Sequence, residues 1–575
     1  MFKAVIPPEN PDANMKSYTE MAANFSWNDI EKEFTWYETG NLNIAYEAVD
    51  RWAENPETAN RVALIYEKGD KVKEFSYLQL QEISSQWSNL FIEYGFAVGD
   101  RMFIFVPPSP EYYFAMLACA RLGIIFCPLF TTLGFDELEV RLQNAKPRGI
   151  ITHPDMAERF PTQSMPSVEY VFLVEGTGVG LFRQEIALKT VAGELPKKSH
   201  IKWVSRSTPL YLLYTTSGST RPPKGVMHAH GAMAGYLATA RCVLDVRERS
   251  MLWTDGGEPG WVTGVVYGAF APWLCGATSV VQGDQFSGST WYRTLERYKV
   301  DVWYTTPRTI TRLMEAGGDL PTRYNLSFLR HIATVGEVLS PEQFYWARNT
   351  LKHSPHDTWW MTESGMICIA NFPSLSIRPG SMGKPVPGIE AEVMDEDGEI
   401  LPVLTMGELA LRPGWPSMMT AIWEDEERYK NYFRVKDWFL TGDMVTKDEN
   451  GYYYHEGRND DLIKVGQRDT GPYEVEQVLS LHQAVAEAVA IATSSPAGRP
   501  TFKAFVRLKS GYTASKRLNL EIKNFVKASF SPEIPLSEIV FLDELPKTRS
   551  GILLYRALMA RELGLPIGDP SKLQE

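Results

Sequence analysis

Cysteine, basic charge and long apolar runs are all scarce in this sequence, and each shortage removes a class of protein. The five cysteines, at positions 119, 127, 242, 275 and 368, are odd in number, scattered and without a CxxC pair. We therefore expect no disulfide framework and a reducing, cytoplasmic location. The net charge of −12 gives no reason to expect nucleic acid or an anionic membrane surface as a partner.

No segment has the pattern of a membrane span or a targeting sequence. The most apolar region, residues 102–129, is interrupted by Pro107, Pro108, Pro110, Glu111 and Arg121, whereas a helical span needs about 20 mainly apolar residues. The N-terminal stretch MFKAVIPPENPDANMKSY lacks the apolar core of a signal peptide. With 575 residues, 44% of them hydrophobic and 22% charged, the composition is that of a soluble globular protein of more than one domain.

Short apolar runs alternate with amphipathic stretches between about residues 60 and 336. This alternation is typical of α/β layers with largely parallel sheets. The pattern over 109–122 predicts a helix with Ser109 as its N-cap and Pro110 at its first position. The expected strands cover residues 101–106, 123–130, 149–153, 170–174, 211–215 and 301–306.

After residue 458 the pattern changes to that of a short α+β unit. Strands are expected at 486–492, 502–508 and 538–542, with a helix over 518–528 and a last helix from about Leu553. We therefore expect a large N-terminal domain of layered α/β sheets over residues 1–459. A small α+β domain would follow over 460–575, with the boundary near Asp460.

The segment TTSGSTRPPKG, residues 215–225, directly follows an expected strand. Small residues and hydroxyls packed this tightly favour a loop whose backbone N–H groups surround a phosphate. A loop of small residues is more often only a loop, and the GxxxxGK[ST] spacing of a Walker A loop does not fit. The candidate phosphate-binding residues are Thr216, Ser217, Gly218, Ser219, Thr220 and Lys224.

The segment DTWWMTESG, residues 357–365, sets two tryptophans beside a hydroxyl and a carboxylate. Indole can stack on adenine, and a glutamate near phosphates can hold Mg²⁺. Taken singly, each tryptophan is more often a core residue. TGD (441–443) and GRNDD (457–461) are consistent with simple turns, or with an aspartate at a strand end that grips a ribose diol.

Two further patterns carry less information. GTGVG, residues 176–180, does not complete GxGxxG and is interpreted as a turn. His228 and His230 form an HAH pair, but no third ligand cluster accompanies them, so metal ligation there is disfavoured.

Eight segments occur in one order: TSGSTRPPKG, GWVTG, VGE, DTWWMTESG, GSMGKPVPG, TGD, GRNDDLIKV and PKTRSG. This series resembles the adenylate-forming superfamily of acyl-CoA synthetases, luciferases and peptide-synthetase adenylation domains, and above all the acetyl- and medium-chain acyl-CoA synthetases. The resemblance extends from about Gly40 to Glu562. It implies a mobile C-terminal domain and two steps: a carboxylate and ATP give acyl-AMP, and the CoA thiol then displaces AMP.

The resemblance also implies roles for individual residues. Thr362 would contact the α-phosphate, Glu363 would hold Mg²⁺ and Asp460 would be the hinge. The rest of the nucleotide would lie on Gly336, Glu337, Asp357, Trp359, Asp443 and Arg458. The acyl group would lie among Trp261, Val262, Thr263, Val335, Trp360 and Gly365, and the CoA side would include Gly466, Gln467 and Arg468. Trp360 stands where acetyl-CoA synthetases use a tryptophan to block the pocket, which implies a short acid. An indole can swing, however, and residues 256–268 depart from the acetate enzymes, so the size of the acyl group stays open.

One position departs sharply from the family. The motif PKTxSGK ends in a lysine that bridges the substrate carboxylate and the α-phosphate, and this chain has Ile552 there. By analogy with one oxyanion-hole donor, such a charge supplies roughly 3–4 kcal/mol, or about 10²–10³ in rate. The loss falls on adenylation alone.

Two other departures concern the phosphates. The family has TGxPKG where this chain has Arg221 and Pro222, and proline restricts the preceding residue and offers no N–H donor. In 463–476, an ungapped comparison with IKVSGxRIGPxEVE puts Gln467 on a glycine and Asp469 on an arginine, whereas a one-residue shift restores both through Gly466 and Arg468. Both registers remain open.

Three hypotheses follow. The preferred one is a ligase that has given up adenylation and transfers an acyl group from an acyl-AMP, made by a separate adenylating enzyme, to CoA. The second is a complete AMP-forming acyl-CoA synthetase in which Lys464, Lys547 or Arg221 replaces the lost lysine. The third is a non-catalytic protein that binds AMP or acyl-AMP. An engineered origin of Ile552 would leave Arg221 and Pro222 unexplained.

Overall fold

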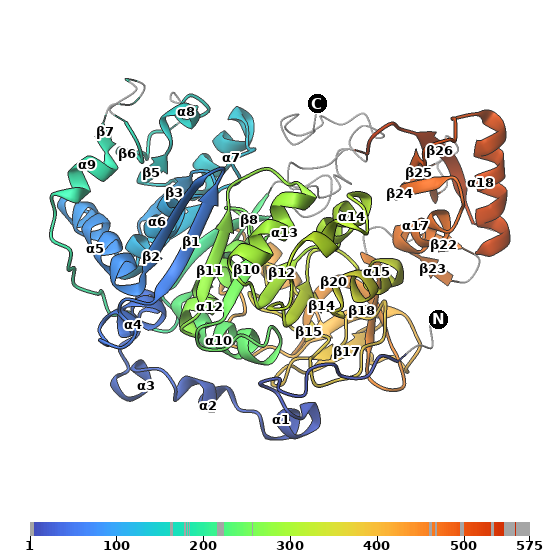
Figure 1. The fold of residues 1–575 in the computed structure, drawn as a ribbon, viewed down its shortest axis with the longest axis horizontal. Helices are drawn as coiled ribbons and strands as arrows, with labels where there is room; N and C mark the ends of the chain where they lie inside the picture. Colours follow the sequence, from blue (N-terminus) through green and yellow to red (C-terminus); the bar gives the residue numbers. More distant parts are fainter. Residues whose placement is uncertain are drawn as a thin grey trace. The chain divides into compact units, whose positions relative to one another are not determined.

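The computed structural model describes the greater part of the chain (Figure 1). The described residues are 5–161, 165–176, 180, 182, 184–215, 223–255, 257–458, 463–465, 468–494, 500–530, 534–545 and 558. Contacts divide the chain into two compact units, described separately below. The large unit comprises Met1–Thr215, Pro223–Glu390 and Pro413–Asn431, and the small unit comprises Thr216–Pro222, Ala391–Arg412 and Tyr432–Glu575. A domain boundary and hinge at Asp460, which lies outside the described residues, stay a prediction.

The first sheet of the large unit has eight described strands, and its centre is parallel as the apolar runs predicted. At one side of it, β8 (Pro209–Thr215) and β9 (Lys224–Ala229) are antiparallel, and β19 (Ala421–Ile422) pairs antiparallel with β9. Its order is β19 (Ala421–Ile422), β9 (Lys224–Ala229), β8 (Pro209–Thr215), β4 (Ile125–Pro128), β3 (Arg101–Phe105), β5 (Gly149–Thr152), β6 (Tyr170–Leu173) and β7 (Glu185–Ala187). The five strands expected between residues 101 and 215 are therefore confirmed.

The second sheet of the large unit has nine described strands and is also parallel through its centre. Its order is β16 (Lys384–Pro385), β15 (Ile369–Ala370), β14 (Pro355–Trp359), β13 (His331–Thr334), β12 (Val302–Thr305), β10 (Met251–Thr254), β11 (Thr278–Gln282), β1 (Val62–Lys68) and β2 (Lys71–Ser76). β12 confirms the strand expected at 301–306. The carboxyl ends of β13 and β14 lead into the VGE and DTWWMTESG segments, the position where open α/β sheets usually bind ligands.

Helices cover both sheets. The helix expected over 109–122 is α6, with Ser109 at its N-cap and Pro110 at its first position. Every residue of α6 is buried, which explains why its sequence is mainly apolar around the helix apart from Glu111 and Arg121. In the second half of the large unit, the helices α13 (Gly288–Arg297), α14 (Pro307–Glu315) and α15 (Pro341–Leu351) pack on β10, β12 and β13 (Figure 1). The longer helices of the large unit are α5 (Tyr77–Glu93), α6 (Pro110–Leu122), α7 (Phe135–Ala145), α10 (Met233–Cys242), α13 (Gly288–Arg297), α14 (Pro307–Glu315) and α15 (Pro341–Leu351).

The small unit combines a four-stranded sheet with an α+β body around a separate core. The four strands are β17 (Ala391–Met394), β18 (Gly407–Leu411), β20 (Phe439–Lys447) and β21 (Tyr453–Arg458). The α+β body contains β22 (Ile463–Val465), β23 (Arg468–Thr470), α17 (Pro472–Ser480), β24 (Val485–Ser494), β25 (Pro500–Leu508), α18 (Lys516–Ser529) and β26 (Leu536–Phe541). The expected strands and the helix over 518–528 are confirmed, whereas the helix expected from Leu553 lies outside the described residues.

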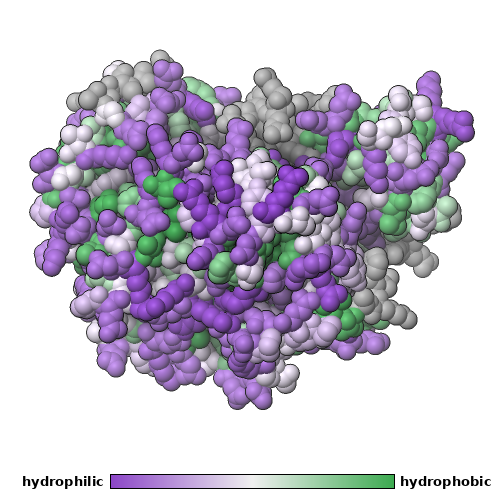
Figure 2. Space-filling model, viewed as in Figure 1, coloured by the Kyte–Doolittle hydropathy of each residue, from purple (hydrophilic) through white to green (hydrophobic). Residues whose placement is uncertain are grey.

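Surface and core agree with the composition. Hydrophilic residues predominate on the face shown in Figure 2, and hydrophobic ones are scattered among them. Across the described ranges, we find no helix with the length and apolar character needed to cross a bilayer. The five cysteines are free and buried, and the apolar region 102–129 forms β3, α6 and β4.

Candidate functional site

The candidate phosphate loop connects two antiparallel neighbours, β8 and β9. Thr215 ends β8, Lys224 begins β9, and the two residues are paired in register. Residues 216–222, which include the five small or hydroxyl-bearing candidates as well as Arg221 and Pro222, lie outside the described residues. Lys224 is therefore the member of this segment whose position the structure gives.

Lys224 forms a buried ion pair with Glu363. Its Nζ contacts Glu363 Oε1, and the two side chains are only 5% and 4% exposed. Glu363 lies in the turn that follows β14, so this contact joins the phosphate loop to the DTWWMTESG segment. Removing one partner of a buried ion pair is strongly destabilising, so this contact ties the two segments together. The carboxylate of Glu363 is a hard oxygen donor that suits Mg²⁺, and Lys224 would compete with the ion for it.

His228 holds the turn that carries Thr362 and Glu363. Its Nε2 lies 2.7 Å from the carbonyl oxygen of Thr362, and its Nδ1 lies 3.0 Å from that of Ser417. Burial lowers the pKa of His228 to about 4, so the ring is neutral near pH 7 and donates to one carbonyl at a time. This histidine, considered above only as a metal ligand, supports a loop.

The same turn is fixed by residues 415–419 of the large unit. The Trp415 indole and the Ser417 hydroxyl both donate to the carbonyl oxygen of Ser364, and Met419 N–H donates to that of Glu363. Gly365 has φ +70°, and a Cβ there would lie 2.2 Å from the Ser417 carbonyl oxygen. Only glycine fits this position without displacing the backbone.

The residues expected near adenine lie where β13 and β14 end. Gly336 has φ +95°, and a Cβ there would lie 3.2 Å from the Trp261 ring, so these two predicted residues are neighbours. Asp357 accepts a hydrogen bond from the Thr334 hydroxyl at 2.7 Å and is buried. Trp359, the last residue of β14, is 8% exposed, and Glu337 is half-buried.

The residues expected around the acyl group are mostly buried. Val262, Thr263 and Val335 are at most 4% exposed, and Trp261 is the N-cap of the short helix α11 (Val262–Val265). Trp360 is half-buried, and its indole N–H donates to the hydroxyl of Tyr304 at 3.0 Å. Tyr304 is a contact that local sequence patterns gave no reason to single out.

Asp443 and Arg458 meet across two neighbouring strands of the small unit. They are opposite each other in β20 and β21, and Arg458 Nη1 donates to Asp443 Oδ1 at 2.7 Å. His455 Nε2 lies 3.8 Å from Asp443 Oδ2. Sequence reasoning missed His455, because a histidine two residues before a glycine in a strand has no distinctive signal.

The described part of the CoA-side segment consists of two short paired strands. Ile463–Val465 and Arg468–Thr470 pair antiparallel, with Val465 opposite Arg468. Gly466 and Gln467 lie outside the described residues, as do the hinge candidate Asp460, the Lys547 alternative and Ile552. The two registers weighed for this segment therefore both stay open.

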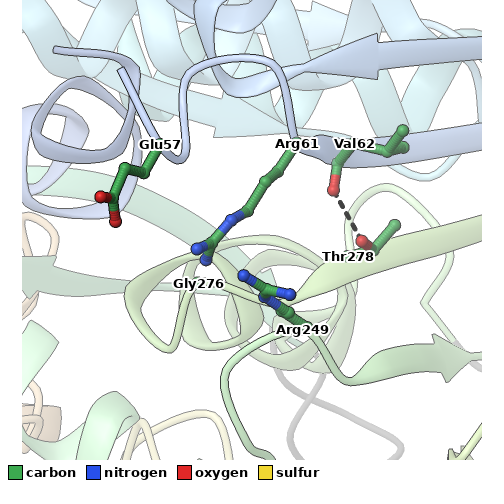
Figure 3. A pocket seen from close by; sticks show the side chains of 6 residues that line it. All are labelled: Glu57, Arg61, Val62, Arg249, Gly276 and Thr278. Atoms are coloured by element: carbon green, nitrogen blue, oxygen red, sulfur yellow. Dashed lines mark hydrogen bonds between the residues drawn. The ribbon is translucent and has the colours of Figure 1, made fainter. Parts of the chain in front are cut away.

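A separate cavity of about 370 Å³ lies at the opposite edge of the nine-stranded sheet, where β1 and β11 begin (Figure 3). Arg61 and Arg249 face it, but Arg61 is paired with Glu248. The lining residues are Glu57, Arg61, Val62, Arg249, Gly276 and Thr278. None of them belongs to the segments described above, and ligands of open α/β sheets bind at the carboxyl edge.

Two family models match this chain. The model described as AMP-binding enzyme matches residues 49–423, and the model described as AMP-binding enzyme C-terminal domain matches residues 474–551. Several curated relatives carry the name acetyl-coenzyme A synthetase. The one from Bacillus subtilis is 42% identical over 574 residues, 99% of each chain. The one from Methanothrix thermoacetophila is 34% identical over 587 residues, 97% of this chain and 88% of the relative.

The fold is shared with solved structures. The acyl-CoA synthetase of Brucella canis matches with a TM-score of 0.74 and 26% identity, over 95% of this chain and 99% of that one. The anthranilate CoA ligase AuaEII in complex with anthranoyl-AMP matches with a TM-score of 0.79 and 26% identity, over 91% of this chain and 98% of that one.

Fold, loops and relatives together define an adenylate-forming ligase, as the order of the sequence segments predicted. The chain belongs to the AMP-binding enzyme family, and within it to the acyl-CoA synthetases.

Proposed function

We propose that this protein makes a short-chain acyl-CoA by transferring the acyl group of an acyl-adenylate to CoA, and that it has lost most or all of the ATP-dependent adenylation step. The observation that carries this proposal is Ile552 in place of the family's lysine, beside an intact set of candidate AMP contacts. A chain that was losing all activity would lose both sets of residues. Selective loss points to the step that handles triphosphate.

The proposed roles follow the reaction. Gly336, Glu337, Asp357 and Trp359 hold the adenine side, while Asp443 and Arg458 bind the ribose. Thr362 contacts the α-phosphate, and residues 216–220 with Lys224 surround the phosphates. The thiol sulfur of CoA, arriving past residues 466–468, attacks the acyl carbon. A C–S bond forms, the bond from the acyl carbon to the phosphate oxygen breaks, AMP leaves, and the thiol proton is lost to solvent.

Loss of the lysine affects only the first step. Adenylation gathers negative charge where the carboxylate meets the α-phosphate, and a fixed cation there stabilises it by roughly 3–4 kcal/mol. Thioester formation releases AMP and needs no such bridge. Mg²⁺, when bound, would neutralise phosphate charge, and Glu363 is the residue that would hold it once Lys224 gives way.

A short acid is proposed because Trp360 is anchored. Its indole N–H donates to Tyr304, and its ring meets Tyr267 edge-on with centroids 5.1 Å apart. An indole held at two points closes the space that a longer acyl chain would need. The acetyl-coenzyme A synthetase names of the relatives support the same size class.

The second candidate function is a complete AMP-forming acetyl-CoA synthetase. The names of the relatives favour it, and it requires Lys464, Lys547 or Arg221 to take over the lost charge. A non-catalytic acyl-AMP-binding protein is the third candidate, and it would show binding without turnover. A separate adenylating enzyme is a partner only under the first proposal.

One assay separates the three. The protein is given short carboxylic acids with ATP and Mg²⁺, and separately the synthetic acyl-adenylates with CoA, and both AMP and thioester are measured. We expect turnover of the adenylates alone, and ATP-dependent activity about 10²–10³-fold higher in Ile552→Lys, with a further gain when Arg221→Gly is added. Direct use of acid and ATP by the unaltered protein would establish the complete ligase. If no adenylate gives a thioester, only the third candidate, the non-catalytic acyl-AMP-binding protein, remains.

A further inference from the structure

We propose that Tyr304 and Tyr267 are positioning residues that lock Trp360 in the closed state and thereby set the length of acyl chain the site accepts. This inference deepens the proposed function, because it rests on Trp360 lining the acyl pocket. All contacts that carry it lie within the large unit.

A directed chain of hydrogen bonds leads from Trp360 into the sheet. The indole N–H of Trp360 donates to the Tyr304 hydroxyl at 3.0 Å, which lies 2.8 Å from Thr358 Oγ1. The Thr358 hydroxyl donates its own hydrogen to the carbonyl oxygen of Thr334 at 2.7 Å. Thr358 can therefore only accept from Tyr304. The donor direction of both hydroxyl groups, those of Tyr304 and Thr358, is therefore fixed. Neither hydroxyl can rotate without breaking a hydrogen bond.

Tyr267 supports the indole from a second side. Its ring is perpendicular to Trp360 with centroids 5.1 Å apart, and perpendicular to Tyr304 with centroids 5.4 Å apart. Such edge-to-face pairs are favourable for aromatic rings. The Tyr267 hydroxyl accepts from Ile367 N–H at 2.9 Å and lies 2.8 Å from Thr239 Oγ1. Since Thr239 donates to the Gly235 carbonyl oxygen, Tyr267 donates to Thr239.

The two tyrosines are fully buried, whereas Trp360 is the least buried member of the cluster. Tyr267 and Tyr304 are fully buried, and burial raises the pKa of each hydroxyl, so both stay protonated. Trp360 is half-buried. If the indole swung aside to admit a longer chain, the buried Tyr304 hydroxyl would lose its donor while the indole found water. The length of acyl chain that the site accepts is thus controlled by the free energy needed to break the Trp360–Tyr304 hydrogen bond, as well as by the volume of the indole.

The test measures binding, with no need for turnover. Non-reactive acyl-sulfamoyl adenosines with acetyl, butanoyl and hexanoyl chains are titrated calorimetrically into the protein. In Tyr304→Phe, which removes only the hydroxyl, we expect the acetyl analogue to bind within about twofold of the unaltered protein. The ratio of acetyl to hexanoyl affinity should fall about tenfold, the value of one lost hydrogen bond of about 1.4 kcal/mol. Trp360→Gly should lower the ratio further.

A double variant shows whether Tyr304 acts through Trp360 or whether its substitution loosens the packing of the site in general. In the double variant Trp360→Gly with Tyr304→Phe, the ratio should equal that of Trp360→Gly, because Tyr304 acts through the indole. The matched control is Tyr236→Phe, which removes an equally buried hydroxyl paired with Tyr211 at 2.9 Å. Its ratio should match that of the unaltered protein.

Two failures can be told apart. If Trp360→Gly changes the ratio but Tyr304→Phe does not, or if Tyr236→Phe changes it as much as Tyr304→Phe, the lock is overturned. If Trp360→Gly itself leaves the ratio unchanged, the assignment of Trp360 to the acyl pocket is wrong. Absence of adenylate turnover would count against the half-reaction but would leave these binding ratios meaningful.

Discussion

The Lys224–Glu363 pair is the contact on which the candidate site depends most at the scale of single residues. Both side chains are almost fully buried, and the pair joins β9 to the turn after β14. In Lys224→Met the Glu363 charge would be left buried without its ammonium. We expect the free energy of unfolding to fall by about 3–5 kcal/mol, measured by urea unfolding followed by circular dichroism.

The chain offers a matched control for this prediction. Lys146 and Glu424 form an ion pair whose side chains are 59% and 49% exposed, so Lys146→Met should cost less than about 1 kcal/mol. Replacing both partners by Lys224→Met and Glu363→Leu should regain most of the lost stability, because no charge then stays buried. An unchanged unfolding midpoint in Lys224→Met alone would show that the pair does not stabilise the fold.

At the scale of elements, the end of the turn 362–365 lies so close to the backbone of Ser417 that only glycine fits at position 365. Gly365→Ala would force a Cβ to within 2.2 Å of the Ser417 carbonyl oxygen at φ +70°. We expect a clear drop in Tm and weaker binding of acetyl-sulfamoyl adenosine, since Thr362 and Glu363 would move.

The control variant Gly40→Ala separates the effect of the left-handed backbone conformation from that of the steric contact with Ser417. Gly40 has φ +69°, but a Cβ there would meet nothing within 4 Å. It should cost only the left-handed backbone term of about 1–2 kcal/mol and leave binding unchanged. Equal losses of stability in the two variants would mean that the contact with Ser417 is unimportant.

Elements with a strong local pattern could be predicted from the sequence. β3 and β5 are buried on both faces, so each appears as a nearly continuous apolar run. Pro110 and the apolar residues after it predicted α6 within one residue of its observed start. Very short strands such as β15 and β16, each of two residues, carry too little pattern to be recognised.

The support of the candidate site could not be predicted in the same way. His228 and Ser417 meet the 362–365 turn across 134 and 53 residues of chain. Neither segment has a local periodicity that marks the contact. Tyr304 and Tyr267 likewise look like ordinary core aromatics until the fold places them against Trp360. Resemblance to a family supplied the candidate residues, whereas the contacts that hold them required coordinates.

At the scale of the whole molecule, buried histidines make stability depend on pH. Burial lowers the pKa of His228 and His356 to about 4, that of His230 to about 3, and that of His331 well below its usual value. On acidification, these histidines therefore bind protons in the unfolded chain at pH values where they remain neutral in the folded protein. Asp255 partly opposes this effect, because burial raises its pKa to about 6 and the folded protein gains a proton there.

The net sign is a loss of stability on acidification. From about pH 6.5 down to about pH 4, the free energy of unfolding should fall by about 1.4 kcal/mol per pH unit for each net proton. Urea midpoints measured across this range check the slope, and His230→Gln should make it shallower by about one proton. A flat profile between about pH 6.5 and 4.5 would contradict the prediction.

The division of the chain into two units has a consequence for the order of synthesis. Residues 391–412 belong to the small unit, but 413–431 return to the large one, where β19 completes a sheet edge and residues 415–419 fasten the 362–365 turn. A ribosome that has released only the first 390 residues has therefore not yet supplied all of the large unit. The candidate site can reach its final form only after residues 391–412 of the small unit and then residues 413–431 of the large unit have been synthesised.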